Sequence, residues 1–259
     1  MGKVRLFDIG INNVSMDETV KSVSVFLKSP KFHLIITLNA NHLYIIQRIE
    51  PALMEIYKNA DLITADSVSL IWASRLLMSP IKERVTGADL LPLIFSLSVR
   101  ERCKIFMIKV KGGGTDSEIE RSLIKRFPGL NIAGTHYVDY DLDMDTDTSE
   151  DEVIMSNVLR VSPDILILSV GWPRGVKWIW RNRDLLSSVP VCIEVGAAVD
   201  FASGRIKRAP LWMRRAGLEW LFRLCLEPRR LWRRNLVNNT YFLLALAKEC
   251  FKTLQIRKI

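Results

Sequence analysis

A single carboxylate stands where a catalytic base is expected. Asp66 ends the run "ADLITAD" and precedes the helical "SVSLIWASRLL". A carboxylate there has two uses: it accepts a proton as a general base, or it accepts backbone N–H bonds as the N-cap of the helix. The two uses conflict, because N–H donors favour the charged form, lower the pKa and weaken the base. The spacing alone leaves both open.

Other polar residues follow apolar runs in the same way. Thr37 and Asn39, in "TLNANH", suit hydrogen bonds to a sugar or a uracil, or a turn that caps the next helix. Arg84, in "KERVTGADLL", precedes a Thr-Gly helix start, which suits a diphosphate clamp of arginine and helix N–H groups. A surface ion pair is the alternative for Arg84.

The sequence does not predict metal chemistry. In "DYDLDMDTDTSEDE", the residues Asp141, Asp143, Asp145 and Glu152 have EF-hand spacing, but Thr146 stands where the loop needs glycine. A solvated loop before an acidic helix start is the simpler interpretation. The glycines of "KGGGTD" match neither dinucleotide-binding nor P-loop spacing. No cofactor is expected.

The elements that must position these residues alternate between strand-like and helical stretches. A parallel, Rossmann-like α/β sheet with helices on both faces is therefore predicted. Ligands of such sheets bind beyond the carboxyl ends of the strands. Ser15 and Glu18 form a capping-box signature before the first helix. The predicted strands are "VRLFDIGI", "FHLIITL", "DLITA", "KIFMIKV", "NIAGT", "DILILSV" and "VCIEV".

The positive charge is confined to the C-terminal fifth. The net charge is +9 over 259 residues, yet residues 207–259 hold 13 Lys and Arg against 3 Asp and Glu, and the remainder holds 24 against 25. We expect an α/β domain over 1–206 and a basic amphipathic helical appendage over 207–259. Such asymmetry indicates a polyanionic partner, either nucleic acid or an anionic membrane surface.

The cellular setting is predicted from what the segments lack. "MGKVRLFDIG" has no signal-peptide core, and "YFLLALA" is too short to span a bilayer. The 4 cysteines form no CxxC pair, which suits a reducing compartment. A cytoplasmic protein, peripheral on the inner face of the membrane, is expected.

An ordered set of segments resembles a known family. "TLNANHLYII", "NADLITADSVSLIWASRLL", "ERVTGADLLP", "FPGLNIAGTHY", "GAAVDFASGRIKRAP" and "GLEWLFRLCLEPRRLWRR" occur in this order. Together they resemble the WecG/TagA/CpsF family, glycosyltransferase family 26, from about Val4 to Tyr241.

The resemblance implies an inverting, metal-independent transferase. Its donor would be a UDP-sugar carrying N-acetylmannosamine, the uronic acid of that sugar, or a hexose. Its acceptor would be a polyprenyl-diphosphate-linked sugar of cell-surface polysaccharide or teichoic acid biosynthesis. The resemblance assigns Asp66 as the base. It places Thr37, Asn39, Arg84, Gly171 and Asp200 at substrate-binding positions, and Arg223, Arg230 and Arg233 of the appendage at the lipid diphosphate and membrane.

Three positions depart from the family pattern. Ser67 stands where the family has glycine after its aspartate. In "GWPRGVKW", Gly175 and Val176 stand where the family has a glutamine, regarded as a substrate-site residue, and a glutamate. These departures bear on the donor sugar.

The arginines of the appendage pose a separate question of geometry. On one continuous helix Arg223, Arg230 and Arg233 would share a face, but Pro228 is expected to bend or break that helix.

Two alternatives to the transferase remain: a relative that binds nucleotide-sugar or lipid diphosphate without catalysis, and a nucleic-acid-binding protein. The latter is disfavoured, because the basic segment is strongly apolar. A homo-oligomer is left open.

Overall fold

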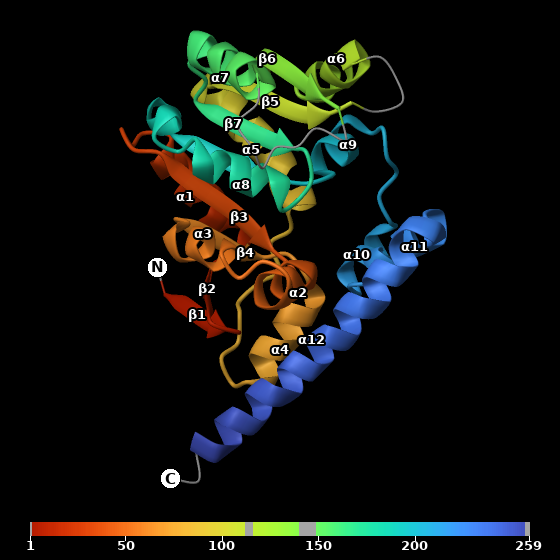
Figure 1. Cartoon of the computed structure of the whole chain (residues 1–259). Coiled ribbons are helices and arrows are strands. Elements are labelled where there is room, and N and C mark those ends of the chain that lie inside the picture. Colours follow the sequence, from red (N-terminus) through yellow and green to blue (C-terminus); the bar gives the residue numbers. More distant parts are fainter. Residues whose placement is uncertain (1, 112–115, 140–148, 257–259) are drawn as a thin grey trace.

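The protein is built on one parallel six-stranded sheet. The structure is a computed structural model that describes residues 2–111, 116–139 and 149–256. The order across the sheet is β4-β3-β8-β7-β5-β6, and every neighbouring pair is parallel, which confirms the predicted α/β class (Figure 1). The strands are β3 (His33–Leu38), β4 (Leu62–Ala65), β5 (Lys104–Val110), β6 (Asn131–Val138), β7 (Ile165–Ser169) and β8 (Val191–Glu194).

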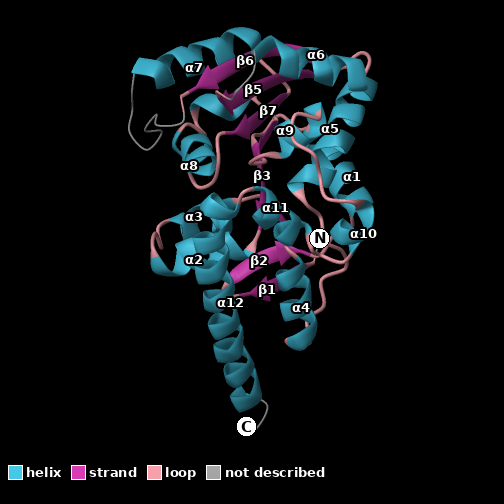
Figure 2. Ribbon diagram, turned by 90° about the vertical axis from the view of Figure 1, so that its right-hand side faces the viewer, coloured by secondary structure: helices cyan, strands magenta, loops and turns pink. Residues whose placement is uncertain are grey.

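Helices cover both faces of this sheet. The central strand β7 is buried along its whole length, as the apolar run "ILILS" requires when both faces are covered. On one face lie α2 (Ala40–Arg48), α3 (Leu53–Asn59), α7 (Ser149–Val161) and α8 (Arg174–Arg181). On the other lie α1 (Met16–Phe26), α5 (Gly87–Glu101), α6 (Asp116–Arg126) and α9 (Ala198–Ser203) (Figures 1 and 2).

The N-terminal run differs from the prediction. "VRLFDIGI" is not one strand but an antiparallel hairpin of β1 (Lys3–Leu6) and β2 (Ile9–Asn12). Phe7 and Asp8 form its turn with φ of 52° and 68°, the positive values that a tight two-residue hairpin turn needs. The apolar pattern hid this turn, because Phe7 is itself buried. The Ser15–Glu18 capping box is confirmed at the start of α1.

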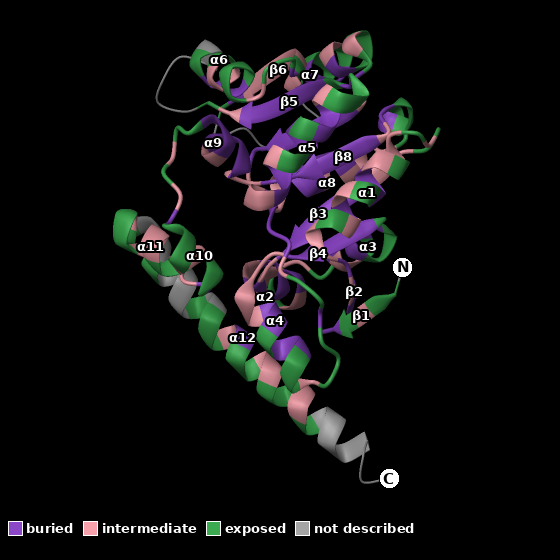
Figure 3. Cartoon of the chain, turned by 180° about the vertical axis from the view of Figure 1, so that it is seen from behind, coloured by how far each residue is buried: buried purple, intermediate pink, exposed green. Residues whose placement is uncertain are grey.

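The C-terminal residues form three helices. These are α10 (Leu211–Arg215), α11 (Glu219–Leu226) and α12 (Pro228–Ile256). Pro228 begins α12, so the expected break is confirmed. Figure 3 shows α12 as a long helix along the body, and its described residues are mostly exposed or half-buried. Within the residues that the structure describes, every helix is too short or too polar to cross a membrane.

The long helix is anchored to the body by aromatic side chains. Phe242 is buried and packs against Phe7, with ring centroids 5.5 Å apart. The Tyr241 hydroxyl donates to Gln47 of α2 at 2.7 Å.

The division into a domain over 1–206 and an appendage over 207–259 stays a prediction. Most of "KGGGTD" and of the acidic stretch lies outside the described residues.

Candidate functional site

The carboxyl ends of β3, β4, β7 and β8 meet at one edge of the sheet. Thr37 is the next-to-last residue of β3, and Asn39 follows that strand directly. Asp66 follows β4, and Gly171 lies two residues beyond β7. Because all these strands are parallel, the fold gathers four of the predicted site residues at the edge where such sheets bind ligands.

Asp66 is a carboxylate with a raised pKa at the end of β4. Its backbone N–H donates to Leu38 at 2.8 Å, which ties the start of the β4 loop to β3. Burial raises the pKa of its carboxyl to about 7, and this effect outweighs a hydrogen bond from the Gly87 backbone and the positive charge of Arg84, which both lower it. A carboxyl that titrates near neutral pH suits a general base.

The N-cap alternative for Asp66 is wrong. Helix α4 (Val68–Leu76) has Ser67 at its N-cap, and the Ser67 side chain makes no capping hydrogen bond. The backbone donor to Asp66 is Gly87, at the start of a different helix, α5. Ser67, one of the departures from the family pattern, instead pairs its hydroxyl with that of Ser69 at 2.9 Å.

Thr37 lies under the start of helix α5. Its side chain is buried, and a Cβ added at Gly87 would lie 3.3 Å from its Oγ1. Thr86 caps α5 by accepting the Asp89 backbone N–H at 3.0 Å. Thr37 therefore sets how closely the N-terminus of α5 approaches the edge that Asp66 occupies.

Asn39 is a cap and also the first member of a polar chain. Its Oδ1 accepts the backbone N–H groups of Asn41 and His42 at 3.0 and 3.3 Å, which confirms the capping interpretation. Its amide pairs with His42 Nε2 at 3.1 Å, and His42 Nδ1 pairs with the Tyr57 hydroxyl at 2.8 Å. The His42 ring stacks on Trp172 at 4.0 Å.

Burial keeps that histidine uncharged. It lowers the pKa of His42 to about 3, so the ring is neutral at physiological pH. A neutral imidazole between an amide and a phenol forms one fixed hydrogen bond to each of them. His42 therefore positions Asn39 and Trp172 rather than transferring protons.

Glu194 is the site residue that the sequence analysis missed. It is the last residue of β8, its exposed fraction is 4%, and its Oε1 accepts the Gly196 backbone N–H at 3.0 Å. Burial, followed by the negative charge of Asp66, raises the pKa of its carboxyl to about 7, although the Gly196 hydrogen bond lowers it. The signal was present, since a charge inside the apolar run "VCIEV" needs an explanation.

Arg84 is held by the C-terminal helices. Its Nη2 donates to the Arg214 carbonyl at 2.8 Å, and it has no carboxylate within ion-pair distance among the described residues. The surface ion pair considered for Arg84 is therefore not what the structure shows. Its guanidinium stays near enough to Asp66 to lower the pKa of that carboxyl.

A cluster of ion pairs joins the same helices to α5. Arg208 bridges Asp89 of α5 and Glu219 of α11, with both of its contacts to Glu219 at 2.9–3.0 Å. Arg214 of α10 reaches the same Asp89 at 3.4 Å. The bidentate geometry fixes α11 in orientation as well as in distance.

The turn between α10 and α11 packs against the start of α4, the helix that follows Asp66. Gly217 adopts φ +74°, and a Cβ added there would lie 2.8 Å from three side-chain atoms of Val68. Val68 is the first residue of α4, two positions after Asp66. Only glycine meets both the positive φ and the close approach.

Two other predicted residues lie farther along the edge. Asp200 of α9 is buried and forms ion pairs with Lys109 of β5 at 3.0 Å and with Arg205 at 2.8 Å. Arg223 of α11 lies over the ring of Phe201 in the same helix α9, 5.6 Å from its centroid. The backbones of Arg230 and Arg233 belong to α12, but their side chains are outside the described residues.

A sequence profile places the chain in a family. The profile described as "Glycosyl transferase WecG/TagA/CpsF family" matches residues 4–256. The chain belongs to this family. Membership makes it a glycosyltransferase, and the α/β sheet is consistent with the Rossmann-like fold of such enzymes.

Characterised relatives resemble the chain over its whole length. An N-acetylglucosaminyldiphosphoundecaprenol N-acetyl-beta-D-mannosaminyltransferase of Staphylococcus aureus (strain NCTC 8325 / PS 47) is 24% identical over 255 residues, covering 96% of this chain and 95% of the relative. The protein of the same description from strain MRSA252 is 23% identical over 256 residues, with the same coverage. This family member therefore spans nearly the full length of these enzymes.

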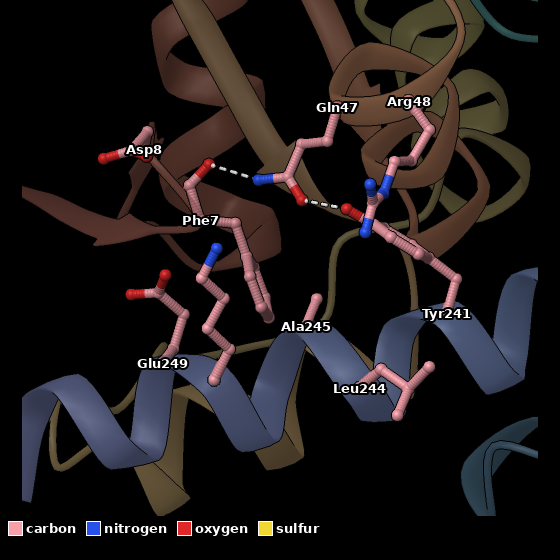
Figure 4. Close-up of a pocket in the computed structure, with 9 residues that line it drawn as sticks. Phe7, Asp8, Gln47, Arg48, Tyr241, Leu244, Ala245 and Glu249 are labelled. Carbon is pink, nitrogen blue, oxygen red and sulfur yellow. Dashed lines mark hydrogen bonds between the residues drawn. The ribbon is translucent and has the colours of Figure 1, made fainter.

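Two surface hollows of the family member lie away from Asp66. One, of about 320 Å³, lies between the β1–β2 hairpin, α2 and α12, and Figure 4 shows Arg48 and Glu249 at its edges. The other, of about 470 Å³, lies near the amino ends of the strands and is lined in part by Asp61 and Arg183. Neither is lined by Asp66 or Glu194.

Proposed function

We propose that the protein transfers a sugar from a UDP-sugar to a polyprenyl-diphosphate-linked sugar. The observation that carries this proposal is Asp66, a desolvated carboxyl at the carboxyl edge of the sheet whose pKa is raised to about 7. The acceptor class follows the relatives, whose names specify an N-acetylglucosaminyl-diphosphoundecaprenol. The donor sugar is N-acetylmannosamine, its uronic acid or a hexose.

In the proposed reaction, Asp66 takes the proton from the acceptor hydroxyl. The acceptor oxygen forms its bond to the anomeric carbon from the face opposite UDP, the bond from that carbon to the phosphate oxygen breaks, and the configuration inverts. The proton ends on Asp66 and the electron pair leaves with UDP. Charge that develops on UDP needs fixed donors, and Arg84 and the N-terminus of α5 supply them without a metal ion.

The C-terminal helices complete the proposed site. The Arg208 bridge and the contact of Gly217 with Val68 hold α10 and α11 beside Asp66. We assign residues 207–259 as the appendage that covers the site, and Arg223, Arg230 and Arg233 as its contacts with the lipid diphosphate. A chain that ends near Arg205 would keep the sheet but transfer poorly.

The same helices present a surface suited to an anionic membrane. Large apolar side chains are exposed on α4, α10, α11 and α12, and Arg215 and Arg229 are exposed among them. Apolar side chains enter the lipid interface while arginines meet the phosphates. These exposed apolar residues include Trp72, Leu76, Leu211, Trp212, Trp220, Leu226 and Trp232.

The deciding experiment measures UDP release with matched variants. The full chain would be assayed with detergent-solubilised polyprenyl-diphosphate-sugar and a panel of UDP-sugars. Asp66→Asn removes the base, and Asp61→Asn makes the same change just before β4, at the opposite end of that strand. We expect acceptor-dependent release that Asp66→Asn abolishes and Asp61→Asn preserves.

The outcomes separate the proposal from its alternatives. UDP binding without release for any donor in the panel would indicate a non-catalytic relative. Release that survives Asp66→Asn would show that another group is the base. Release that needs an added divalent cation would contradict the metal-independent mechanism.

A further inference from the structure

The residue that this inference concerns is Glu194, which the proposed mechanism does not use. Its carboxyl is directed beyond the end of β8, because Oε1 reaches the backbone N–H of Gly196, two residues past the strand. Oε2 has no hydrogen-bond donor within the described residues. No group of the described residues occupies Oε2, so this oxygen is open to water or to a ligand.

The surroundings of Glu194 are polar and also incompletely satisfied. Its negative charge contributes to the raised pKa of the Tyr57 hydroxyl, after burial, which places these two groups near each other. The buried indole N–H of Trp172 lies close to the same hydroxyl without the geometry of a hydrogen bond, and has no other acceptor within the described residues. A buried donor without a partner and a carboxylate oxygen that no group of the described residues occupies together suit a ligand with hydroxyl or amide groups.

Helix α8 approaches the Glu194 side chain closely at a glycine. A Cβ added at Gly175 of α8 would lie 2.7 Å from Glu194 Cγ and 3.2 Å from a methyl group of Val170. Gly175 therefore leaves the volume that Glu194 fills. Position 175 is also where the chain departs from the family pattern, so in this chain β8, rather than α8, supplies a polar side chain at this place.

The charges at this edge restrict what the ligand carries. Asp66 and Glu194 repel each other electrostatically, and neither has a cationic side chain within ion-pair distance among the described residues. Lys109, the buried lysine of β5, is already paired with Asp200. A further carboxylate would have to be desolvated next to two acidic groups, and the cation that acts on Asp66, Arg84, is already assigned to the diphosphate.

We propose that Glu194 contacts the transferred sugar of the donor through Oε2, and that together with Asp66 it selects a neutral sugar over a uronic acid. This inference rests on the proposed function. It excludes one of the donor classes left open above and keeps N-acetylmannosamine and hexoses. The hydroxyl or acetamido group of a neutral sugar would satisfy the carboxyl, and no third acidic group would be added.

The test compares donors that differ only in a carboxylate. Binding of UDP, UDP-N-acetylmannosamine, UDP-N-acetylmannosaminuronic acid, UDP-glucose and UDP-glucuronic acid would be measured by calorimetry on the full chain, with Glu194→Gln alongside. We expect the wild type to bind the neutral member of each pair at least tenfold more tightly. Glu194→Gln should narrow this ratio at least threefold and leave the affinity for UDP unchanged.

A pair of substitutions keeps the test valid if a single variant folds poorly. Gly175→Gln alone should lower the melting temperature, because its Cβ meets Glu194. Gly175→Gln combined with Glu194→Ala should recover it, and should bind neutral donors while the neutral-to-uronate ratio falls. A merely structural role for Glu194 would change stability and leave that ratio as it was.

Each outcome counts for or against the inference separately from the transferase. Tighter binding of the uronate, or a ratio that is the same in wild type and Glu194→Gln, overturns the inference even if transfer is active. The expected ratios without any UDP release would support the inference and sink the proposed reaction. Failure of every UDP-sugar to bind would overturn both.

Discussion

Two acidic regions lie close together in this protein and behave in opposite ways. At the ends of β4 and β8, Asp66 and Glu194 have few donors, and burial raises the pKa of each carboxyl to about 7. At the junction of α5 with the C-terminal helices, partial burial raises the pKa of Asp89, but hydrogen bonds from Arg208 and Thr86 outweigh it and lower the pKa. Burial without a cationic partner within ion-pair distance among the described residues raises the pKa in the first region, and hydrogen bonds from arginine and threonine lower it in the second.

The largest expected effect comes from removing one carboxylate of each region in turn, which tests whether the two regions differ in function. Asp66→Asn should lower turnover by roughly 10²- to 10⁴-fold, the usual contribution of a general base, without loss of stability at pH 8. Asp89→Asn should instead lower the free energy of unfolding by roughly 1–3 kcal/mol, because Arg208 and Arg214 lose their partner. Steady-state kinetics and urea unfolding measure the two. If Asp66→Asn lost as much stability as Asp89→Asn, the distinction between a carboxyl needed for turnover and one needed for stability would be wrong.

A smaller effect on turnover is expected from a substitution that shifts α11 relative to α4 and leaves the charges of the Asp89 junction unchanged. Gly217→Ala introduces strain at φ +74° and a clash with Val68, so α11 must shift away from Asp66. We expect turnover to fall by roughly tenfold to a hundredfold, as for other misplacements of about 1 Å. Gly10→Ala, on the β1–β2 hairpin where the added Cβ meets only the flexible Lys3 side chain, is the control. Unchanged turnover in Gly217→Ala would show that the C-terminal helices do not position the site.

The two regions also predict opposite dependences of stability on pH. Asp66 and Glu194 have raised pKa values, so the folded chain holds more protons than the unfolded chain between about pH 5 and 7, and stability falls as pH rises through that window. Asp89 has a lowered pKa, so its contribution is present above the unfolded pKa and is lost as pH falls through the folded value.

Urea unfolding at several pH values checks both signs. Asp66→Asn and Glu194→Gln should each flatten the decline between pH 5 and 7, by at most about 1.4 kcal/mol per pH unit for one group. Asp89→Asn should leave that decline intact and remove stability most at neutral pH. Turnover should rise about tenfold per pH unit below pH 7 and level above it, as Asp66 ionises.

Periodicity and motif spacing predicted most of the sheet and the place of the site. The apolar runs identified all six parallel strands, and the rule that ligands bind beyond strand ends selected Thr37, Asn39 and Asp66. The hairpin turn at Phe7 and Asp8 was missed, because a buried aromatic side chain in a turn reads as part of a strand.

Contacts between residues far apart in sequence could not be predicted. The sequence shows Gly217 as one glycine among 13, and only the structure shows that it lies against Val68. Glu194 and Gly175 are 19 positions apart, and their close approach depends on how α8 crosses β8. The partner of Arg84 is the carbonyl of Arg214, which composition and spacing do not reveal.

The smallest expected effect concerns the membrane rather than the acidic regions themselves. Arg229 is exposed on α12, in the helices that the Asp89 junction holds in place, whereas Lys31 is exposed just before the amino end of β3. If the C-terminal helices face the lipid, Arg229→Gln should weaken binding to anionic vesicles about fivefold, near 1 kcal/mol for one cation at the surface, and Lys31→Gln should not. Sedimentation with phosphatidylglycerol vesicles at low and high salt measures this. Equal weakening by both variants would mean that net charge alone draws the protein to the membrane. The Asp89 junction would then hold the C-terminal helices over the substrate edge without turning that edge toward the lipid.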